Sequence, residues 1–138
     1  MRILEDDLNV DIYLELRKKV GWVDLTLDQA QKAIDQSIKT FTVHDGDRVI
    51  GMARLVGDGA VVCYIQDLVI SPDYQGKHIG SMLIDVLVKY VESITLPGTR
   101  MMFCLMCAKG REAFYEKHGF TERPTDALGP GMIQFITK

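Results

Sequence analysis

Hydrophobic residues follow two different periods along this chain, one typical of helices and one typical of strands. Over residues 79–94, apolar side chains return every three or four positions, which predicts a long helix with one buried face. Residues 60–70 form a nearly unbroken apolar run, which is typical of a strand covered on both faces. Because only a short turn separates the two segments, the pattern predicts a strand, a turn and a helix in direct succession.

Weaker patterns extend this unit in both directions. The Asp45-Gly46 pair between two short apolar runs predicts a hairpin, because this dipeptide favours the tight turns that join antiparallel strands. Asp28 is the expected N-cap of one helix, and Gly119 is expected to end the last one. The predicted helices cover residues 11–20, 27–38, 79–94 and 109–117, and the predicted strands cover residues 41–43, 48–56, 60–70, 101–106 and 132–137. This order predicts an α/β (α+β) fold, with a mixed central β-sheet and helices on both of its faces.

The size and charge of the chain narrow the classes of function. Its 138 residues suit one domain, expected over residues 1–138, and 47% hydrophobic residues are enough for one core. Sixteen basic against nineteen acidic residues give a formal charge of −3, which provides no basic field for nucleic acid. No apolar run approaches the ~20 residues of a membrane helix, and the first residues turn acidic where a signal peptide would stay apolar. We therefore expect a cytoplasmic protein without nucleic-acid or membrane partners, and a homodimer stays open.

The three cysteines carry a weaker signal. Cys104 and Cys107 have the spacing of a redox or zinc half-site, but on a strand two side chains three positions apart point to opposite faces. No second pair completes four zinc ligands, and the sequence has no His-Glu-x-x-His pattern. We interpret all three cysteines, including Cys63, as free thiols and expect no metal.

The turn between the apolar strand and the long helix is the strongest functional signal. A helix N-terminus presents unpaired N–H groups and a partial positive charge, which together form an anion site from backbone alone. Gly76 and Gly80 allow an anion to approach the backbone, Lys77 adds a cation and Ser81 adds a hydroxyl. The spacing matches neither a P-loop nor a dinucleotide-binding turn. These residues favour a diphosphate ligand over the alternative of a polar helix start without one.

Two segments resemble the GNAT acetyltransferase superfamily. Residues 75–80, Gln-Gly-Lys-His-Ile-Gly, are similar to its acyl-CoA loop, Q/R-x-x-G-x-G/A, and residues 113–120 are similar to its FYEKxGF segment. The resemblance covers about residues 49–120, and it implies the GNAT fold with acetyl-CoA as co-substrate. Two positions depart from the pattern, because His78 replaces the usual middle glycine and Ala108 stands where an asparagine is common.

The resemblance also implies which residues bind acetyl-CoA. The diphosphate is expected on the loop, and the pantetheine arm is expected to pair with the backbone of the preceding strand as though it were another strand. The implied cofactor-binding residues are Leu68, Val69, Ile70, Gln75, Gly76, Lys77, His78, Ile79, Gly80 and Ser81. Tyr115 is expected beside the cofactor sulfur, where its phenol would protonate the departing thiolate. The alternative is a tyrosine that only packs.

Asp67 stands out as a carboxylate inside the apolar strand, where an unpaired charge is costly to bury. It either has a structural hydrogen-bonding role or lines the acceptor cleft, where it would take the amine's proton directly or through water, or hold the ammonium before reaction. Gln66, beside it, is a weaker candidate for hydrogen bonding to the acceptor. In this superfamily the N-terminal helices usually border the acceptor cleft, so Tyr13 and Trp22 are candidate wall residues, with the core as the alternative place for both.

These features predict an N-acetyltransferase that moves an acetyl group from acetyl-CoA to a primary amine of a small molecule, by direct transfer through a ternary complex. The amine must first lose a proton, because alkylamines with a pKa near ~10.4 are protonated at neutral pH. The rival is a CoA-binding regulatory or sensor module without catalysis, which the departures at His78 and Ala108 keep open. An acyl-enzyme on cysteine is a third alternative, and no cysteine has a base next to it in the sequence.

Overall fold

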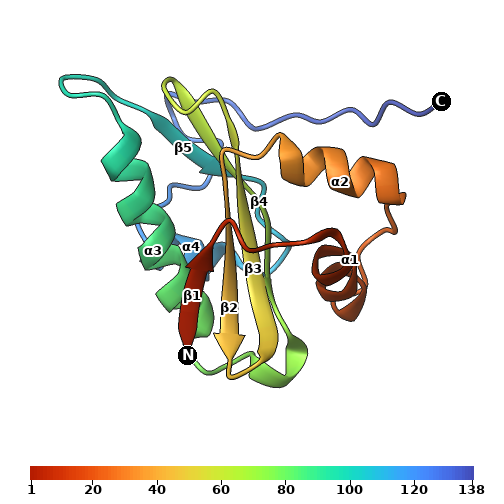
Figure 1. Cartoon of the computed structure of the whole chain (residues 1–138). Coiled ribbons are helices and arrows are strands. Elements are labelled where there is room, and N and C mark those ends of the chain that lie inside the picture. Colours follow the sequence, from red (N-terminus) through yellow and green to blue (C-terminus); the bar gives the residue numbers. More distant parts are fainter. The chain divides into compact units, whose positions relative to one another are not determined.

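A computed structural model describes all 138 residues, and the chain forms two compact units, residues 1–105 and residues 106–138. The first unit contains a five-stranded sheet in the order β1-β2-β3-β4-β5 (Figure 1). Its elements are β1 (Arg2–Glu5), α1 (Val10–Lys19), α2 (Leu27–Asp35), β2 (Lys39–Asp45), β3 (Arg48–Gly57), β4 (Val62–Ile70), the 3₁₀ turn η1 (Pro72–Tyr74), α3 (Ile79–Ile94) and β5 (Met102–Leu105). The prediction of one domain over residues 1–138 stays a prediction.

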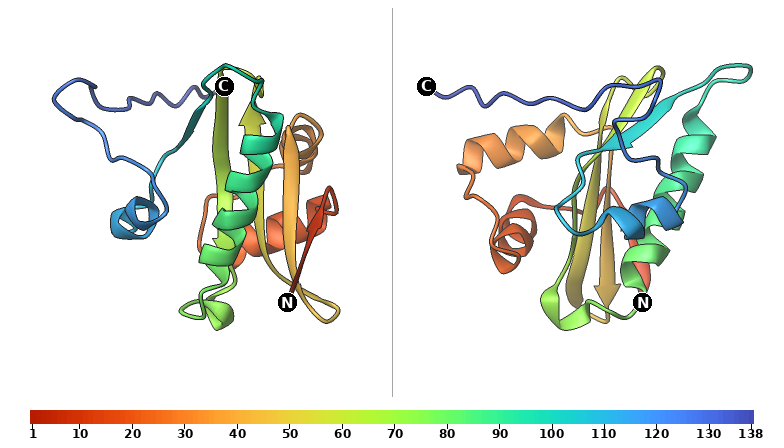
Figure 2. Two further views of the ribbon diagram at one scale, coloured as in Figure 1. Left: turned by 90° about the vertical axis from the view of Figure 1, so that its left-hand side faces the viewer. Right: turned by 180° about the vertical axis from the view of Figure 1, so that it is seen from behind.

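Three antiparallel pairings and one parallel pairing build the sheet. Asp45 pairs with Arg48, so the β2–β3 hairpin turns through Gly46 as the Asp-Gly signal predicts, with a left-handed φ of 58° at the glycine. β4 and β5 run parallel, because the long helix α3 carries the chain back along the sheet. Figure 2 shows this return from two sides. The mixed sheet with helices confirms the predicted fold class.

Helices cover both faces of this sheet, with α1 and α2 on one side and α3 on the other (Figures 1 and 2). The core cluster under α1 and α2 consists of Leu8, Tyr13, Leu16, Ala30, Met52 and Val69. On α3, the predicted apolar stripe supplies the fully buried Leu83 and Leu87, and Ile84, which the predicted stripe did not include, is fully buried as well. The ring of Tyr90 meets that of Phe41 on β2 edge to face, with 5.7 Å between the centroids. None of the helices combines the length and apolar composition that crossing a membrane requires.

Two strands of the first unit differ from the sequence prediction. β1 was not predicted, and it pairs along the edge of β2 through four residues. β5 is half-exposed and not buried, because it lies at the other edge of the sheet. The N-cap of α2 also differs, since the Thr26 hydroxyl accepts from the Gln29 N–H at 3.1 Å and Asp28 lies inside the first turn.

The second unit contains one short helix, α4 (Glu112–Lys117). Gly119 follows it with a left-handed φ of 93°, as expected for the residue that ends a helix. The predicted strand over residues 132–137 was wrong, because this segment has no regular structure. Its large apolar side chains are exposed, at Met132, Ile133, Phe135 and Ile136. A strand pattern becomes a strand only where a neighbouring strand accepts its backbone hydrogen bonds.

Candidate functional site

The loop between β4 and α3 is anchored firmly at the end of the strand. Ser71 is buried, and its N–H donates to the carbonyl of Ile50 at 2.7 Å. The side-chain amide of Gln75 donates back to the carbonyl of Ile70 at 2.9 Å. With its base held in this way, the loop delivers the chain directly to the start of α3.

Helix α3 begins without a side-chain cap. Asn9 and Thr26 cap α1 and α2 through side-chain oxygens, whereas no side chain caps α3 at His78. The carbonyl of His78 accepts from the N–H of Met82 at 3.1 Å. The N–H groups of the first turn, such as that of Ile79, therefore have no intrahelical acceptor and point out of the helix end. They and the positive end of the helix dipole suit a bound anion.

The conformation of the loop adds to this anion site. Gly76 and His78 both have left-handed φ values, 77° and 63°. Residues of this kind among right-handed neighbours can turn successive N–H groups into one concave surface, a recurring anion site. A Cβ at Gly76 would meet nothing within 4 Å, so the space beside it is open. His78 adopts a conformation that glycine reaches without strain, which gives a physical reason for the glycine that is usual at this position.

One side of β4 has no strand partner next to this loop. β5 pairs with β4 only from Val62 to Ile65, in parallel with residues 102–105. Farther along, Val69 and Ile70 pair with β3 on the opposite side. Beyond Ile65 the backbone of β4 therefore has no strand partner on its β5 side.

Asp67 lies at a bulge between these two parts of β4. Val69 pairs with Met52 and Gln66 pairs with Arg54, so β4 has one residue more than β3 between the two pairs. Asp67 has a left-handed φ of 62°, a conformation that few residues with a side chain other than Asn and Asp adopt readily. The bulge turns the carboxylate toward Arg54.

The carboxylate of Asp67 accepts four side-chain hydrogen bonds. Oδ2 accepts from the hydroxyl of Tyr13 and from Nε of Arg54 at 3.1 Å. Oδ1 accepts from Nη1 of Arg17 at 2.7 Å and from Nε2 of Gln66 at 3.2 Å. A carboxylate has about four lone-pair sites, so each site has a donor. The geometry favours the structural role for Asp67, because a proton from an amine would have to displace one of these donors.

The guanidinium groups of Arg54 and Arg17 also donate to backbone carbonyls on the side of the sheet that α1 and α2 cover. Nη1 of Arg54, which is buried on β3, donates to the carbonyl of Ala33 in α2 at 2.9 Å. Nη2 of Arg17, in α1, donates to the carbonyl of Val23 at 2.9 Å. Asp67 is therefore connected to α1, to α2 and to the segment between them.

Tyr13 is a core residue and not a wall of an acceptor cleft. Its side chain is 1% exposed, and the guanidinium carbon of Arg54 lies 5.3 Å from its ring centroid. Burial and the hydrogen bond to Asp67 raise the pKa of Tyr13 to about 12, so the phenol stays a donor at neutral pH. Trp22 is half-buried, and the guanidinium carbon of Arg17 lies 5.3 Å from its ring centroid. Of the site residues predicted from the sequence, the structure thus brings Tyr13, Gln66 and Asp67 into contact.

Arg17 and Arg54 are site residues that the sequence patterns missed. A signal for Arg54 exists, because it is the one charged residue in the apolar run 50–56, as Asp67 is in β4. Opposite charges in two buried neighbouring strands predict a pair, since either charge alone would be costly. Arg17 has no such signal, because it stands beside Lys18 and Lys19 in a charged part of α1.

Tyr115 lies in α4 of the second unit. Its ring meets those of Phe114 and Phe120 edge to face, at centroid distances of 5.1 and 5.9 Å. Burial raises the pKa of Tyr115 above the ordinary 10.0, and Cys107 adds to the effect while Arg111 opposes it. The phenol is protonated at neutral pH, as any tyrosine with a pKa at or above its ordinary value is, and as a proton donor must be.

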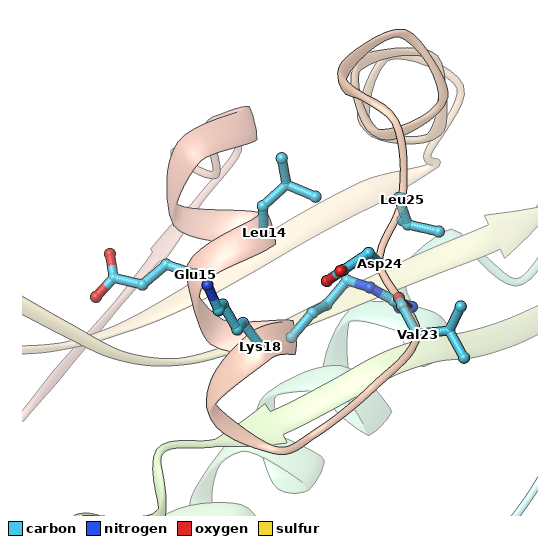
Figure 3. Close-up of a pocket in the computed structure, with 7 residues that line it drawn as sticks. Leu14, Glu15, Lys18, Val23, Asp24 and Leu25 are labelled. Carbon is cyan, nitrogen blue, oxygen red and sulfur yellow. Dashed lines mark hydrogen bonds between the residues drawn. The ribbon is translucent and has the colours of Figure 1, made fainter.

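A pocket of about 460 Å³ lies between α1 and the segment that leads to α2 (Figure 3). It is lined by Leu14, Glu15, Arg17, Lys18, Val23, Asp24 and Leu25. Apolar side chains and charges of both signs meet there. The pocket shares Arg17 and Val23 with the network around Asp67.

Comparison with known proteins places the chain among acetyltransferases. The family model described as "Acetyltransferase (GNAT) domain" matches residues 36–122. An uncharacterized N-acetyltransferase ycf52-like protein of Prochlorococcus marinus is 31% identical over 114 residues, which are 80% of this chain and 61% of that relative. The chain thus spans less than two thirds of the length of this relative.

Solved structures agree with this family. The probable acetyltransferase SA2161 of meticillin-resistant Staphylococcus aureus has a TM-score of 0.85 and 29% identity, and the match covers 98% of both chains. An aminoglycoside 6'-N-acetyltransferase complexed with coenzyme A has a TM-score of 0.59 and 19% identity, over 68% of this chain and 57% of that one. The second likeness is one of fold alone.

Proposed function

Because the chain belongs to the GNAT acetyltransferase family, we propose that it transfers an acetyl group from acetyl-CoA to a primary amine. The observation that carries this proposal is the uncapped start of α3, which follows two left-handed residues, Gly76 and His78. Unpaired N–H groups, a helix dipole and an open approach are what a diphosphate requires.

The rest of acetyl-CoA would follow the side of β4 that has no strand partner. In this proposal the pantetheine arm pairs with the backbone of residues 68–70, which β5 leaves without a strand partner on that side. A strand N–H there would support the thioester oxygen as negative charge develops on it during attack. Lys77, whose ammonium lies 5.2 Å from the ring centroid of Tyr74, would add positive charge near the phosphates.

The chemistry needs a neutral amine and a donor for the departing thiolate. The nitrogen attacks the thioester carbon, the C–S bond breaks, and the thiolate of CoA takes a proton. Tyr115 is the proposed donor because residues 113–120 resemble the family segment that carries the general acid, and its phenol is protonated at neutral pH. We assign the proton of the attacking amine to solvent and not to Asp67, whose lone-pair sites are filled.

The proposed acceptor is a small molecule that carries a primary amine. An open pocket of about 460 Å³ between α1 and residues 23–25 is the proposed place for this amine. Glu15 and Asp24 in its lining would attract an ammonium group, although Arg17 and Lys18 oppose them. A cytoplasmic location, a homodimer and the absence of nucleic-acid and membrane partners stay predictions.

Two measurements test this function. Calorimetry should show one CoA or acetyl-CoA bound per chain. An assay of free CoA release should then show turnover with at least one member of a panel of polyamines, arylalkylamines, aminosugars, amino acids and peptide lysines. Binding of acetyl-CoA without turnover of any amine would favour the rival function, a CoA-binding regulatory or sensor module. No binding of CoA would contradict both.

A further inference from the structure

Asp67 has an unusual position for a carboxylate, since it has a left-handed backbone and lies inside a bulge of a buried strand. Asp reaches this conformation more readily than most residues with a side chain, and here four side-chain hydrogen bonds also hold the carboxylate. Bulges are common next to active sites, where they redirect a strand. The side chains that hold Asp67 in the bulge are therefore candidates for a functional role.

We propose that Arg54 and Arg17 are positioning residues for acetyl transfer, acting through Asp67, whose carboxylate they hold in the bulge of β4. This inference rests on the proposed function. Neither arginine needs to touch acetyl-CoA or the amine in this role. Each binds Asp67 from a different element, Arg54 from β3 and Arg17 from α1.

Arg54 is fixed at both ends of its guanidinium group. Its Nε binds Asp67, while its Nη1 donates to the carbonyl of Ala33 at 2.9 Å and to the hydroxyl oxygen of Ser37 at 3.0 Å. The Ser37 hydroxyl in turn donates to the same Ala33 carbonyl at 2.7 Å. The planar guanidinium group thus connects the bulge rigidly to the end of α2.

Arg17 makes the corresponding connection on the other side of Asp67. Its Nη1 binds Asp67 at 2.7 Å, and its Nη2 binds the carbonyl of Val23 at 2.9 Å. Its guanidinium carbon also lies 5.3 Å from the ring centroid of Trp22, which limits its movement further. The same side chain lines the pocket proposed for the acceptor, so it relates that pocket to the bulge.

The bulge directly precedes the backbone that is proposed to bind the thioester arm, residues 68–70. A change in φ at Asp67 would redirect these N–H groups, and misplacement by about 1 Å can lower a rate roughly 100-fold. The filled lone-pair sites of Asp67 agree with a positioning role and not with proton transfer. The network therefore sets the direction of the strand at the point where the acetyl group would lie.

The experiment compares kcat, KM and the pH profile in four variants, with active chains counted by CoA-binding stoichiometry. Arg54→Met removes the bridge to α2. Ser37→Ala loosens Arg54 from outside the buried network and tests the same idea if Arg54→Met does not fold. Asp67→Asn keeps the shape of the side chain but removes its charge. Lys39→Met is the matched control. It breaks an ion pair on another part of the sheet, in which Nζ of Lys39 lies 2.7 Å from Oδ2 of Asp6.

The inference predicts that Arg54→Met lowers kcat per active chain by about 10- to 100-fold and that Ser37→Ala lowers it several-fold, with KM for acetyl-CoA changed less. Asp67→Asn should lower kcat while the acidic limb of the pH profile keeps its midpoint. Lys39→Met should match the wild type. Folded Arg54→Met and Ser37→Ala with wild-type kcat would overturn the inference and leave the proposed function standing.

Two other results would also overturn it. If Asp67→Asn removes the acidic limb while Ser37→Ala has no effect, Asp67 is the general base and not a positioned anchor. If the wild type binds acetyl-CoA but turns over no amine, the proposed function fails, and the positioning role fails with it.

Discussion

Nε of Arg54 on β3 lies 3.1 Å from Oδ2 of Asp67 on β4, with both side chains almost completely buried. The two residues are 13 positions apart, and the bulge in β4 brings them face to face. Each charge compensates the other in a place where either one alone would be costly. Through Asp67 and the two arginines, β3 and β4 are thus hydrogen-bonded to both α1 and α2.

The loop before α3 should lose its ligand when its open side is filled. Gly76→Glu places a bulky anion where the structure has space and where the diphosphate is proposed to bind, so calorimetry should detect no binding of CoA. Gly98→Glu is the matched control, because Gly98 has the same φ of 77° and also has nothing within 4 Å. Equal CoA affinity in the two variants would place the cofactor elsewhere.

His78→Gly should stabilise the protein. The substitution removes the strain of a side chain at a φ of 63°, about 1–2 kcal/mol, and adds about 0.5–1 kcal/mol of backbone entropy cost. We expect the free energy of unfolding to rise by up to about 1 kcal/mol in denaturant titrations, with CoA affinity equal or higher. A less stable variant with weaker CoA binding would show that the imidazole has a role of its own.

Tyr115→Phe should lower kcat by about 10²–10⁴ if the phenol protonates the thiolate, while CoA affinity is kept. Activity that needs the protonated phenol falls as pH rises through the pKa of Tyr115, which burial raises above 10.0. The wild type should therefore lose activity above pH 10, and the Phe variant should lack this limb. Tyr90→Phe is the control, because Tyr90 on α3 also packs its ring against a phenylalanine, Phe41 on β2. Full activity of Tyr115→Phe across pH would show that the departing thiolate takes its proton from solvent and not from Tyr115.

Tyr13 should make the protein sensitive to alkaline pH. Its pKa is about 12 in the folded protein against an ordinary 10.0, so folding favours the protonated phenol. The stabilisation is complete below pH 10 and is lost as pH rises from 10 to 12. The difference in unfolding free energy between wild type and Tyr13→Phe should therefore shrink over this interval. Parallel stability curves for the two proteins would contradict the prediction.

The thiols should differ in reactivity in the folded protein. Burial, with smaller effects from Cys104 and Asp58, raises the pKa of Cys63 to about 11, and its side chain is not exposed. Cys107 is exposed. Because the thiolate is the reactive form, iodoacetamide at pH 7 should label Cys107 well before Cys63, as mass spectrometry would show. Equally fast labelling of Cys63 would reopen the alternative of an acyl-enzyme on cysteine.

Local signals were sufficient for much of the fold and for part of the loop. The stripe over residues 79–94, the Asp45-Gly46 turn and Gly119 each depend on a few neighbouring residues, and the structure confirms all three. At residues 75–80 the turn at Gly76 is also a local signal, while the left-handed conformation of His78 had no such signal. The family resemblance depended on the same short segment and on residues 113–120, and the family match confirms it.

Pairings between distant residues required the tertiary structure. A one-residue bulge reverses which side chains share a face, and nothing in the apolar run of β4 shows where it lies. Only the folded chain brings Arg17, 50 positions away, to Asp67 and buries Tyr13 beside it. The same limit explains the segment 132–137, whose strand pattern met no partner strand. By itself the sequence determined the elements whose causes are local, while the partners of each buried charge were decided by long-range packing, because burial and register depend on residues far apart in the chain.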